Sequence, residues 1–322
     1  MQYFDLVTEI FVSIDDFYTQ FNQRVKEFQL PSPKKSRNRS FLMSGSEVMT
    51  ILVLFHLSQH RSLKHFYLYY VKKHMQAEFP KTVPYNRFVE LMSSVLLPLT
   101  IYLKTCRSGK CSGISFVDST PLRVCHNKRI SSNKVFADIA QRGKTSMGWF
   151  FGFKLHIIVN DNEVILLKPS RFVTFKLHII VNDKGEVINF AFTEANVDDR
   201  QPLISGKLLK EIWGKLFGDR GYISQNLFQT LFVDGIHLIT KIRKNMKNSL
   251  MNINDKILLR KRALIETIND ELKNICQIEH SRHRSVVNFV TNTIAGLIAY
   301  SFLPKKPAIK CQFQQTKQIA FC

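Results

Sequence analysis

A nine-residue segment, FKLHIIVND, occurs twice in this 322-residue chain, at positions 153–161 and 175–183. The pattern is typical of a β-strand followed by a turn, and a further strand-like segment, GEVINFAFTEA, follows the second copy. Two identical strands compete for one place in a sheet, because either can pair with the same neighbours. One local repeat does not make a solenoid, which needs several. We therefore expect one sheet domain that carries the duplication as an added hairpin.

The segments around the repeat follow an order that indicates a mixed fold. Strand-like segments begin near Cys111: GISFVDS, GWFFGFKLHIIVND, GEVINFAFTEA, KLFGDRG and HLITKIR. Helix-like segments lie between and after them: LISGKLLKEIW, ISQNLFQTLF and KILLRKRALIETINDELKNI. Three strands followed by alternating helices and strands predict an α/β (α+β) fold, a mixed sheet with helices against its faces.

The region before the sheet is expected to be helical. Apolar residues recur at helical spacing from Phe11 to Phe21. The segment RSLKHFYLYYVKKH, residues 61–74, mixes basic and aromatic side chains, which suits a DNA-contacting helix and equally a core helix with a basic outer side. The predicted parts of the chain are a helical DNA-binding region at 1–105, a sheet domain at 106–304, and a basic, polar tail at 305–322.

The charge balance indicates a polyanionic partner. The chain has 46 Lys and Arg against 25 Asp and Glu, a formal net charge of +21. Nucleic acid is the commonest partner for such an excess, and a ribosome-like or membrane-surface protein is the alternative. Polar residues interrupt the apolar stretch Val286–Leu303, so a buried helix is expected there and no membrane partner. With no secretory signal and no C-x-x-C pair, the chain is expected in the cytoplasm with reduced cysteines.

Three carboxylates are candidates for the chemistry. Asp118 ends the strand-like segment SFVDST, Asp219 ends KLFGDRG, and Glu266 lies in the helix-like RKRALIETINDELK. If they converge at one sheet edge, they form an oxygen-only site of the kind that Mg²⁺ prefers. Two such ions would activate a nucleophile and stabilise the leaving oxygen of a phosphodiester. Each residue also has a plain alternative: a turn or N-cap aspartate, and a solvated glutamate paired with Arg262.

Other polar clusters are weaker candidates for a metal site. Asp198 and Asp199 are expected to cap the following helix, with Asp199 as a fourth metal ligand as the alternative. Cys125 and His126, with the cysteines upstream, lack the ligand spacing of a zinc site.

Several motifs, in order, carry a resemblance to a known family. VDSTPLRVCHNKRI, GWFFGFKLHIIVND, FTEANVDDR, FGDRGYIS and R-x-x-x-E-x-x-x-x-x-x-K together resemble a DDE-type insertion-sequence transposase, most like the insertion-sequence 982 family. The resemblance covers nearly the whole chain. It implies a ribonuclease-H-like core, dependence on two Mg²⁺ or Mn²⁺ ions, and Asp118, Asp219 and Glu266 as the catalytic metal ligands.

The resemblance also bears on DNA contacts. Arg262 and Lys273 match two positions of the Y-R-E-K signature of related transposases, whereas Leu259 stands in place of its tyrosine. Basic segments elsewhere suit contact with a DNA backbone, and a solvated basic face is their alternative. The residues expected to contact DNA are Arg262, Lys273, Arg220, Arg129, Lys241 and Arg243.

The function implied is cleavage of double-stranded DNA at terminal inverted repeats, followed by strand transfer into target DNA. A homodimer in a synaptic complex and a nucleoid-associated location in a bacterial cell go with it. Two alternatives stand beside it: a nuclease of the same fold that does not join DNA, and a catalytically impaired remnant that only binds DNA. The remnant is an alternative because the duplication lies between Asp118 and Asp219, which are 101 positions apart.

Overall fold

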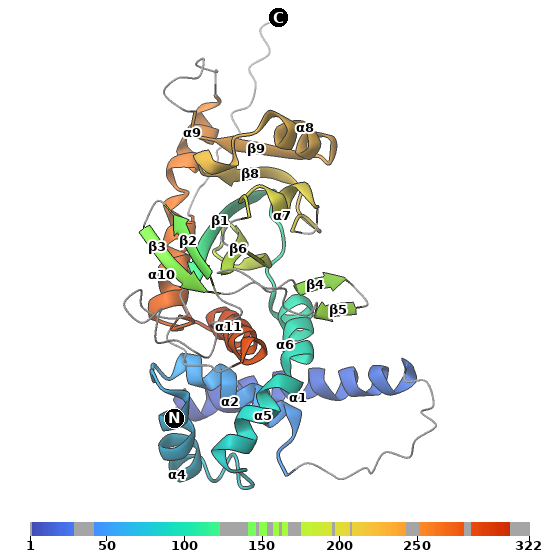
Figure 1. Cartoon of the computed structure of the whole chain (residues 1–322), viewed down its shortest axis with the longest axis vertical. Helices are drawn as coiled ribbons and strands as arrows, with labels where there is room; N and C mark the ends of the chain where they lie inside the picture. Colours follow the sequence, from blue (N-terminus) through green and yellow to red (C-terminus); the bar gives the residue numbers. More distant parts are fainter. Residues whose placement is uncertain are drawn as a thin grey trace, which may run out of the picture.

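The structure is a computed structural model of the whole chain, with helices gathered at one end and a five-stranded sheet towards the other (Figure 1). It describes residues 2–28, 42–122, 141–145, 148–152, 157–160, 163–166, 175–194, 197–206, 208–242, 251–279 and 285–309.

The N-terminal region is helical over its described residues, which confirms that expectation. Its elements are α1 (Gln2–Phe28), α2 (Gly45–Leu57), α3 (Leu63–His65), η1 (Phe66–Val71), α4 (Lys72–His74), α5 (Tyr85–Ser94), α6 (Leu96–Tyr102) and η2 (Leu103–Arg107). A capping box begins α2: the Ser44 side chain accepts from the Glu47 amide, and the Glu47 carboxylate accepts from the Ser44 amide. Over the described residues, no single helix has both the length and the apolar character of a membrane span, although Tyr85–Ser94 and Leu96–Arg107, bent by 56°, pass that test as a pair.

The central sheet has the order β7-β6-β1-β8-β9. Its strands are β1 (Ile114–Leu122), β6 (Phe175–Asn182), β7 (Val187–Glu194), β8 (Gly214–Gly218) and β9 (Ile236–Thr240). Strands β1, β6 and β7 pair antiparallel, and β8 and β9 continue parallel to β1. Numbered along the chain, the order is 3-2-1-4-5, which is the order of a ribonuclease-H-like sheet. The predicted fold class is confirmed.

Each face of the sheet has its own apolar core. Phe116 and Ile179 belong to a large core that also contains the N-terminal helices, whereas their neighbours Val117 and Ile180 belong to a smaller core on the other face. The helices of the first face are α9 (Ile253–Arg260), α10 (Ala263–Asn274) and α11 (Val286–Ser301). Those of the second are α7 (Gln201–Ile204), η5 (Arg220–Tyr222) and α8 (Gln225–Val233). The helix α11 is buried along almost its whole length and lies between the sheet and α2 (Figure 1).

The second copy of the nonamer occupies the sheet. It forms β6 beside β1, whereas the first copy contributes β4 (Ile157–Asn160), which pairs with β5 (Glu163–Leu166) in a separate hairpin. The expected added hairpin is therefore confirmed. Another hairpin joins β2 (Gln141–Thr145) and β3 (Gly148–Gly152), so the prediction of one strand through GWFFGFKLHIIVND was wrong.

The residues after each copy explain this choice. The second copy is followed by β7, in which Ala191 and the buried Phe192 continue an apolar strand. When the two EVI segments are aligned, Lys168 and Pro169 stand at those positions after the first copy. Proline cannot donate to a strand ladder, and lysine does not suit a core-facing sheet. Only the second copy therefore brings a usable neighbouring strand.

Two further predictions were wrong in detail. The segment LISGKLLKEIW is helical only as far as Ile204, because Gly206 and Glu211 both take positive φ angles, of 69° and 63°, that end and then redirect the backbone. The strand that contains Asp118 does not end there but continues to Leu122.

Candidate active site

The two aspartates come together through the register of the sheet. Parallel pairing between β1 and β8 ends at Phe116 and Phe217, which are partners. Continuing the same register by two residues places Asp118 beside Asp219, where the ladder has stopped and the two strands separate. Adjacent strands lie about 4.8 Å apart, and residues in register face the same side. Phe116 and Phe217 are partners 101 positions apart, and Asp118 and Asp219 are separated by the same number of positions.

The glycines around Asp219 serve local packing. Asp219 caps η5, and its Oδ1 accepts from the Gly221 amide at 2.8 Å. A Cβ added at Gly221 would lie 2.9 Å from that oxygen, and one added at Gly218 would lie 3.0 Å from the Tyr222 ring. Both positions exclude larger residues unless the Asp219 turn shifts, so the G-D-R-G sequence sets the position of this carboxylate.

Glu266 reaches the site from the first turn of α10. A single guanidinium joins it to Asp118: Arg262 donates to Glu266 Oε1 at 2.9 Å and to Asp118 Oδ1 at 3.5 Å. The Asn269 amide, one turn further along α10, donates to Asp118 Oδ2 at 2.8 Å. The α10 helix therefore holds Asp118 from two sides. Asn269 was not predicted, although its spacing of three residues from Glu266 places it on the same helical face.

The pKa of Asp118 depends on the charges of the other two carboxylates. Burial raises the pKa of Asp118 from 3.8 to about 6. The Arg262 guanidinium lowers this pKa, and the charges of Asp219 and then Glu266 raise it. The site is therefore a partly desolvated group of like charges that Arg262 neutralises incompletely.

These residues fit a divalent metal by their chemistry. Carboxylate oxygens are the ligands that Mg²⁺ and Mn²⁺ prefer, and a desolvated group of negative charges is stabilised by a cation. Arg262 supplies the positive charge between Asp118 and Glu266. Within the part of the chain that the structure describes, no group of three His, Cys, Asp or Glu side chains is close enough together to hold a metal ion.

A second polar layer lies on the other face of the sheet, at the same end. His178 is the antiparallel partner of Ser119; its Nε2 lies 2.6 Å from the Thr193 hydroxyl, and its buried Nδ1 makes no hydrogen bond. Lys176 donates to Asp199 at 2.7 Å. The buried Tyr222 ring completes the layer, and burial followed by the charges of Asp118, Asp199 and Asp219 raises the pKa of its hydroxyl.

This layer was not predicted from the sequence. The signal for it was a lysine and a histidine on one face of an otherwise apolar strand, in both copies of the nonamer. Asp199 is held by Lys176, while Asp198 accepts from the backbone amide of Arg200 at 3.0 Å and pairs with its guanidinium.

The remaining predicted DNA contacts are spread over the chain. Lys273 donates to the Pro121 carbonyl at 3.1 Å and pairs with Glu279 at 3.2 Å, so it lies beside the end of β1. Arg220 and Lys241 are exposed, after β8 and β9 respectively. Arg129 and Arg243 lie outside the described residues, as do Cys125 and His126.

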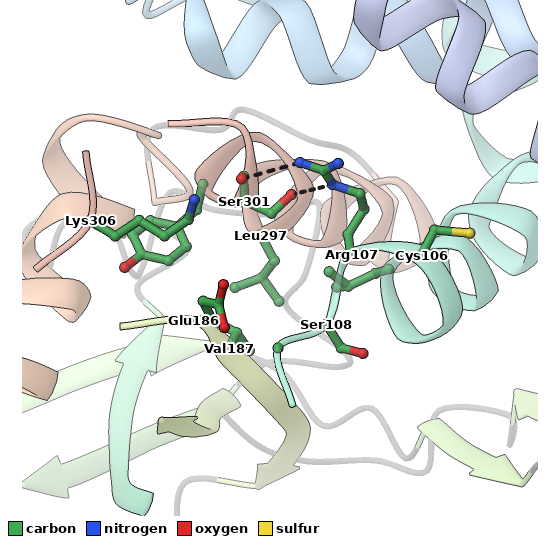
Figure 2. Close-up of a pocket in the computed structure, with 11 residues that line it drawn as sticks. Cys106, Arg107, Ser108, Glu186, Val187, Leu297, Ser301 and Lys306 are labelled. Atoms are coloured by element: carbon green, nitrogen blue, oxygen red, sulfur yellow. Dashed lines mark hydrogen bonds between the residues drawn. The ribbon is translucent and has the colours of Figure 1, made fainter. Parts of the chain in front are cut away.

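A cavity of about 230 Å³ lies apart from this site, where η2, α11 and the turn between β6 and β7 meet (Figure 2). Its polar wall is already engaged: Arg107 donates to the side chain and the carbonyl of Ser301. None of the three carboxylates lines it.

Comparison with known proteins identifies the family. A family model described as "Transposase DDE domain" matches residues 108–171 and 168–286. The two matched segments meet between the copies of the nonamer, as expected if a duplication interrupts one family pattern. No curated protein matches the chain.

Among solved structures, the chain is similar to a piggyBac transposase synaptic complex with hairpin DNA, with 11% identity, a TM-score of 0.42, and coverage of 91% of this chain and 72% of that one. It is also similar to the Mos1 strand transfer complex, with 12% identity, a TM-score of 0.22, and coverage of 87% and 82%. The family match spans more than half of the chain and includes Asp118, Asp219 and Glu266, so this chain belongs to the DDE transposases, the enzymes of DNA transposition.

Proposed function

We propose that Asp118, Asp219 and Glu266 are the acidic triad of this transposase and hold its divalent metal ions. The observation that carries the proposal is the β1–β8 register, which aligns the two aspartates where their strands separate. The bridge from Glu266 through Arg262 to Asp118 adds the third carboxylate. Two Mg²⁺ or Mn²⁺ ions bound there would supply Lewis-acid activation of the attacking oxygen and stabilisation of the leaving one.

The reaction has two displacements at phosphorus. Water attacks a phosphodiester at the transposon end, the bond from phosphorus to the 3′ oxygen breaks, and a 3′-hydroxyl and a 5′-phosphate remain. That 3′-hydroxyl then attacks a phosphodiester of the target, losing its proton and displacing a target 3′ oxygen. No protein nucleophile is needed, so the side chains of this chain position the reactants and balance charge.

Arg262 and Asn269 have separate roles in this proposal. Asn269 orients Asp118 through its 2.8 Å hydrogen bond. The guanidinium of Arg262 neutralises Asp118 and Glu266, and its fork of donors can turn to a DNA phosphate once those carboxylates have another cation. Lys273, Arg220, Arg129, Lys241 and Arg243 are proposed to contact the DNA backbone.

The finer assignments rest on the sequence motifs. We propose membership of the insertion-sequence 982 family, and recognition of terminal inverted repeats by the helical region at 1–105, with the catalytic part at 106–304 and the tail at 305–322. A homodimer would bring two DNA ends together, on the bacterial nucleoid.

The test is an Asp219→Ala variant assayed on a DNA duplex carrying the element's own end. We expect no cleavage in Mn²⁺ and unchanged binding in EDTA. Asp234→Ala is the matched control, because Asp234 is an exposed aspartate at the end of α8. Full cleavage by the Asp219→Ala protein would refute the triad assignment.

The two alternatives need a second assay. A pre-cut end with a free 3′-hydroxyl is offered together with target DNA, so that joining is measured without cleavage. A nuclease of the same fold would cleave the intact end without joining the pre-cut one, and an impaired remnant would bind the DNA and do neither.

A further inference from the structure

The helix formed by α3, η1 and α4, residues 63–74, has an outer face with an unusual charge. No acidic residue occurs between Gln59 and Ala77, whereas the stretch contains four Lys or Arg and three His. Lys64, His65, Lys73 and His74 are exposed. Within the described residues, none of the Lys or Arg side chains of this stretch pairs with a carboxylate.

The inner face of the same helix anchors it firmly. Phe66, Tyr67 and Val71 are fully buried. The Tyr67 ring stacks on Phe88 of α5 at 4.3 Å, and its hydroxyl donates to the Val83 carbonyl at 2.7 Å. The outer face is therefore presented on a rigid support.

The rings on the outer face are already stacked against one another. His65 stacks on Tyr69 with 4.8 Å between centroids, and the Lys73 ammonium lies 4.9 Å from the centroid of the Tyr69 ring. His65 lies one turn before Tyr69 and Lys73 one turn after it, so they flank the ring along the helix axis. The Tyr69 side chain is nonetheless 52% exposed, which leaves its edge and hydroxyl open to a partner.

This arrangement favours one kind of contact. A platform for base stacking needs an aromatic face that is free, as in proteins that bind single strands. The Tyr69 ring is already in contact with His65 and with Lys73, so it offers its hydroxyl and its edge rather than a free face. Ammonium and hydroxyl donors on an exposed, firmly anchored helix face suit the phosphates of a duplex, which carry most of the affinity but little sequence information.

We propose that the outer face of this helix, formed by Lys64, His65, Tyr69 and Lys73, binds the sugar-phosphate backbone of duplex DNA without sequence preference. The inference rests on the proposed function, in which the N-terminal region holds transposon-end DNA, and it names the surface and the mode of contact. Figure 1 places α4 at the end of the molecule away from β8 and β9. The duplex held here therefore lies some distance from the phosphodiester that is cut.

The test is binding of the full chain to a 30-base-pair duplex of arbitrary sequence, measured by fluorescence anisotropy in EDTA over a range of salt concentrations. For a Lys64→Gln/Lys73→Gln double variant we expect weaker binding and a log–log salt slope reduced by about 2, since each phosphate contact contributes about 0.9. The loss should be equal on a duplex carrying the element's own end. Tyr69→Phe keeps the ring contacts and should weaken binding with no change in slope.

The control is Lys184→Gln/Lys305→Gln, which removes the same charge from exposed lysines elsewhere. An equal loss in the control, no loss in the Lys64/Lys73 variant, or a loss confined to single-stranded DNA would each overturn the proposal. Because EDTA removes the divalent metal ions, the binding assay measures DNA affinity without DNA cleavage. If the surface variant binds normally while the parent cleaves in Mn²⁺, the surface is wrong and the proposed function stands.

Discussion

At the residue scale, Asp118, which we propose as a metal ligand, shows how a buried carboxylate lowers the stability of the fold when it is charged. Its pKa is raised by burial from 3.8 to about 6, which corresponds to about 3 kcal/mol at a pH above both values. Because the pKa is higher in the folded state, protonation of Asp118 favours folding. That contribution to the stability of the fold is fully present below about pH 4 and is lost as the pH rises through about 6. In EDTA at pH 8, Asp118→Asn should therefore melt at a higher temperature than the parent, and the gain should vanish below pH 4. A gain that is equal at both pH values would contradict the burial argument.

His178 provides a second test, for which the chain contains its own control. The neighbours of His178 and His156 are identical over nine residues, but only the second copy occupies the sheet. His178→Ala removes the 2.6 Å contact with the Thr193 hydroxyl and truncates a fully buried side chain, at a cost of about 0.5–3 kcal/mol. His156→Ala should change the melting temperature much less. Equal effects of the two substitutions would mean that the copies exchange places.

The same histidine predicts a pH dependence. Burial lowers the pKa of His178 to about 4, and the charge of Asp199 partly offsets this. The folded pKa lies below the ordinary value of about 6.5, so its contribution to stability is lost as the pH falls from about 6.5 to 4. The difference between parent and His178→Ala, measured by urea unfolding, should shrink over that interval. A constant difference would show that His178 is not buried as the neutral imidazole.

At the scale of secondary-structure elements, the β4–β5 hairpin lies outside the five-stranded sheet. Deletion of residues 153–174 joins Gly152 to Phe175, so that GWFFG is followed directly by the copy of the nonamer that occupies the sheet. No strand of the five-stranded sheet is removed, and every residue of the β1–β6 and β1–β8 pairings is retained. We therefore expect the deleted protein to fold and to cleave DNA at least as well as the parent. Loss of folding would show that the β4–β5 hairpin is part of the core.

Patterns in the sequence predicted most elements but missed some ends. Alternating apolar residues located β6, β7 and β9, because one buried face requires that period. The segment LISGKLLKEIW has the apolar spacing of a helix, yet its backbone turns at Gly206 and Glu211, and Leu208, Leu209 and Ile212 are buried in the smaller core. Apolar spacing alone therefore does not locate the end of this helix.

At the scale of the whole molecule, the helical region and the sheet share one core. Phe289, Ile294 and Ile298 of α11 are buried in the same cluster as residues of α1 and α2. His56 of α2 lies 2.5 Å from the Cys276 carbonyl, a bond that joins α2 to the segment after α10. A fragment of residues 1–105 lacks these partners and is expected to show no cooperative thermal unfolding by circular dichroism. A cooperative transition in that fragment would establish an independent domain.

The sequence by itself determined the candidate residues and their order: two aspartates after apolar runs, a glutamate in a helix, and a basic chain suited to DNA. These follow from local periodicity and composition, which any short segment carries. Only the tertiary structure decided which copy of FKLHIIVND pairs with β1, that the separation of Asp118 and Asp219 equals a sheet register, and that Arg262 and Asn269 hold Asp118. The physical reason is that pairing and burial compare distant segments: identical strands have identical local preferences, and only the residues packed around them, such as Ala191 and Phe192, distinguish one from the other.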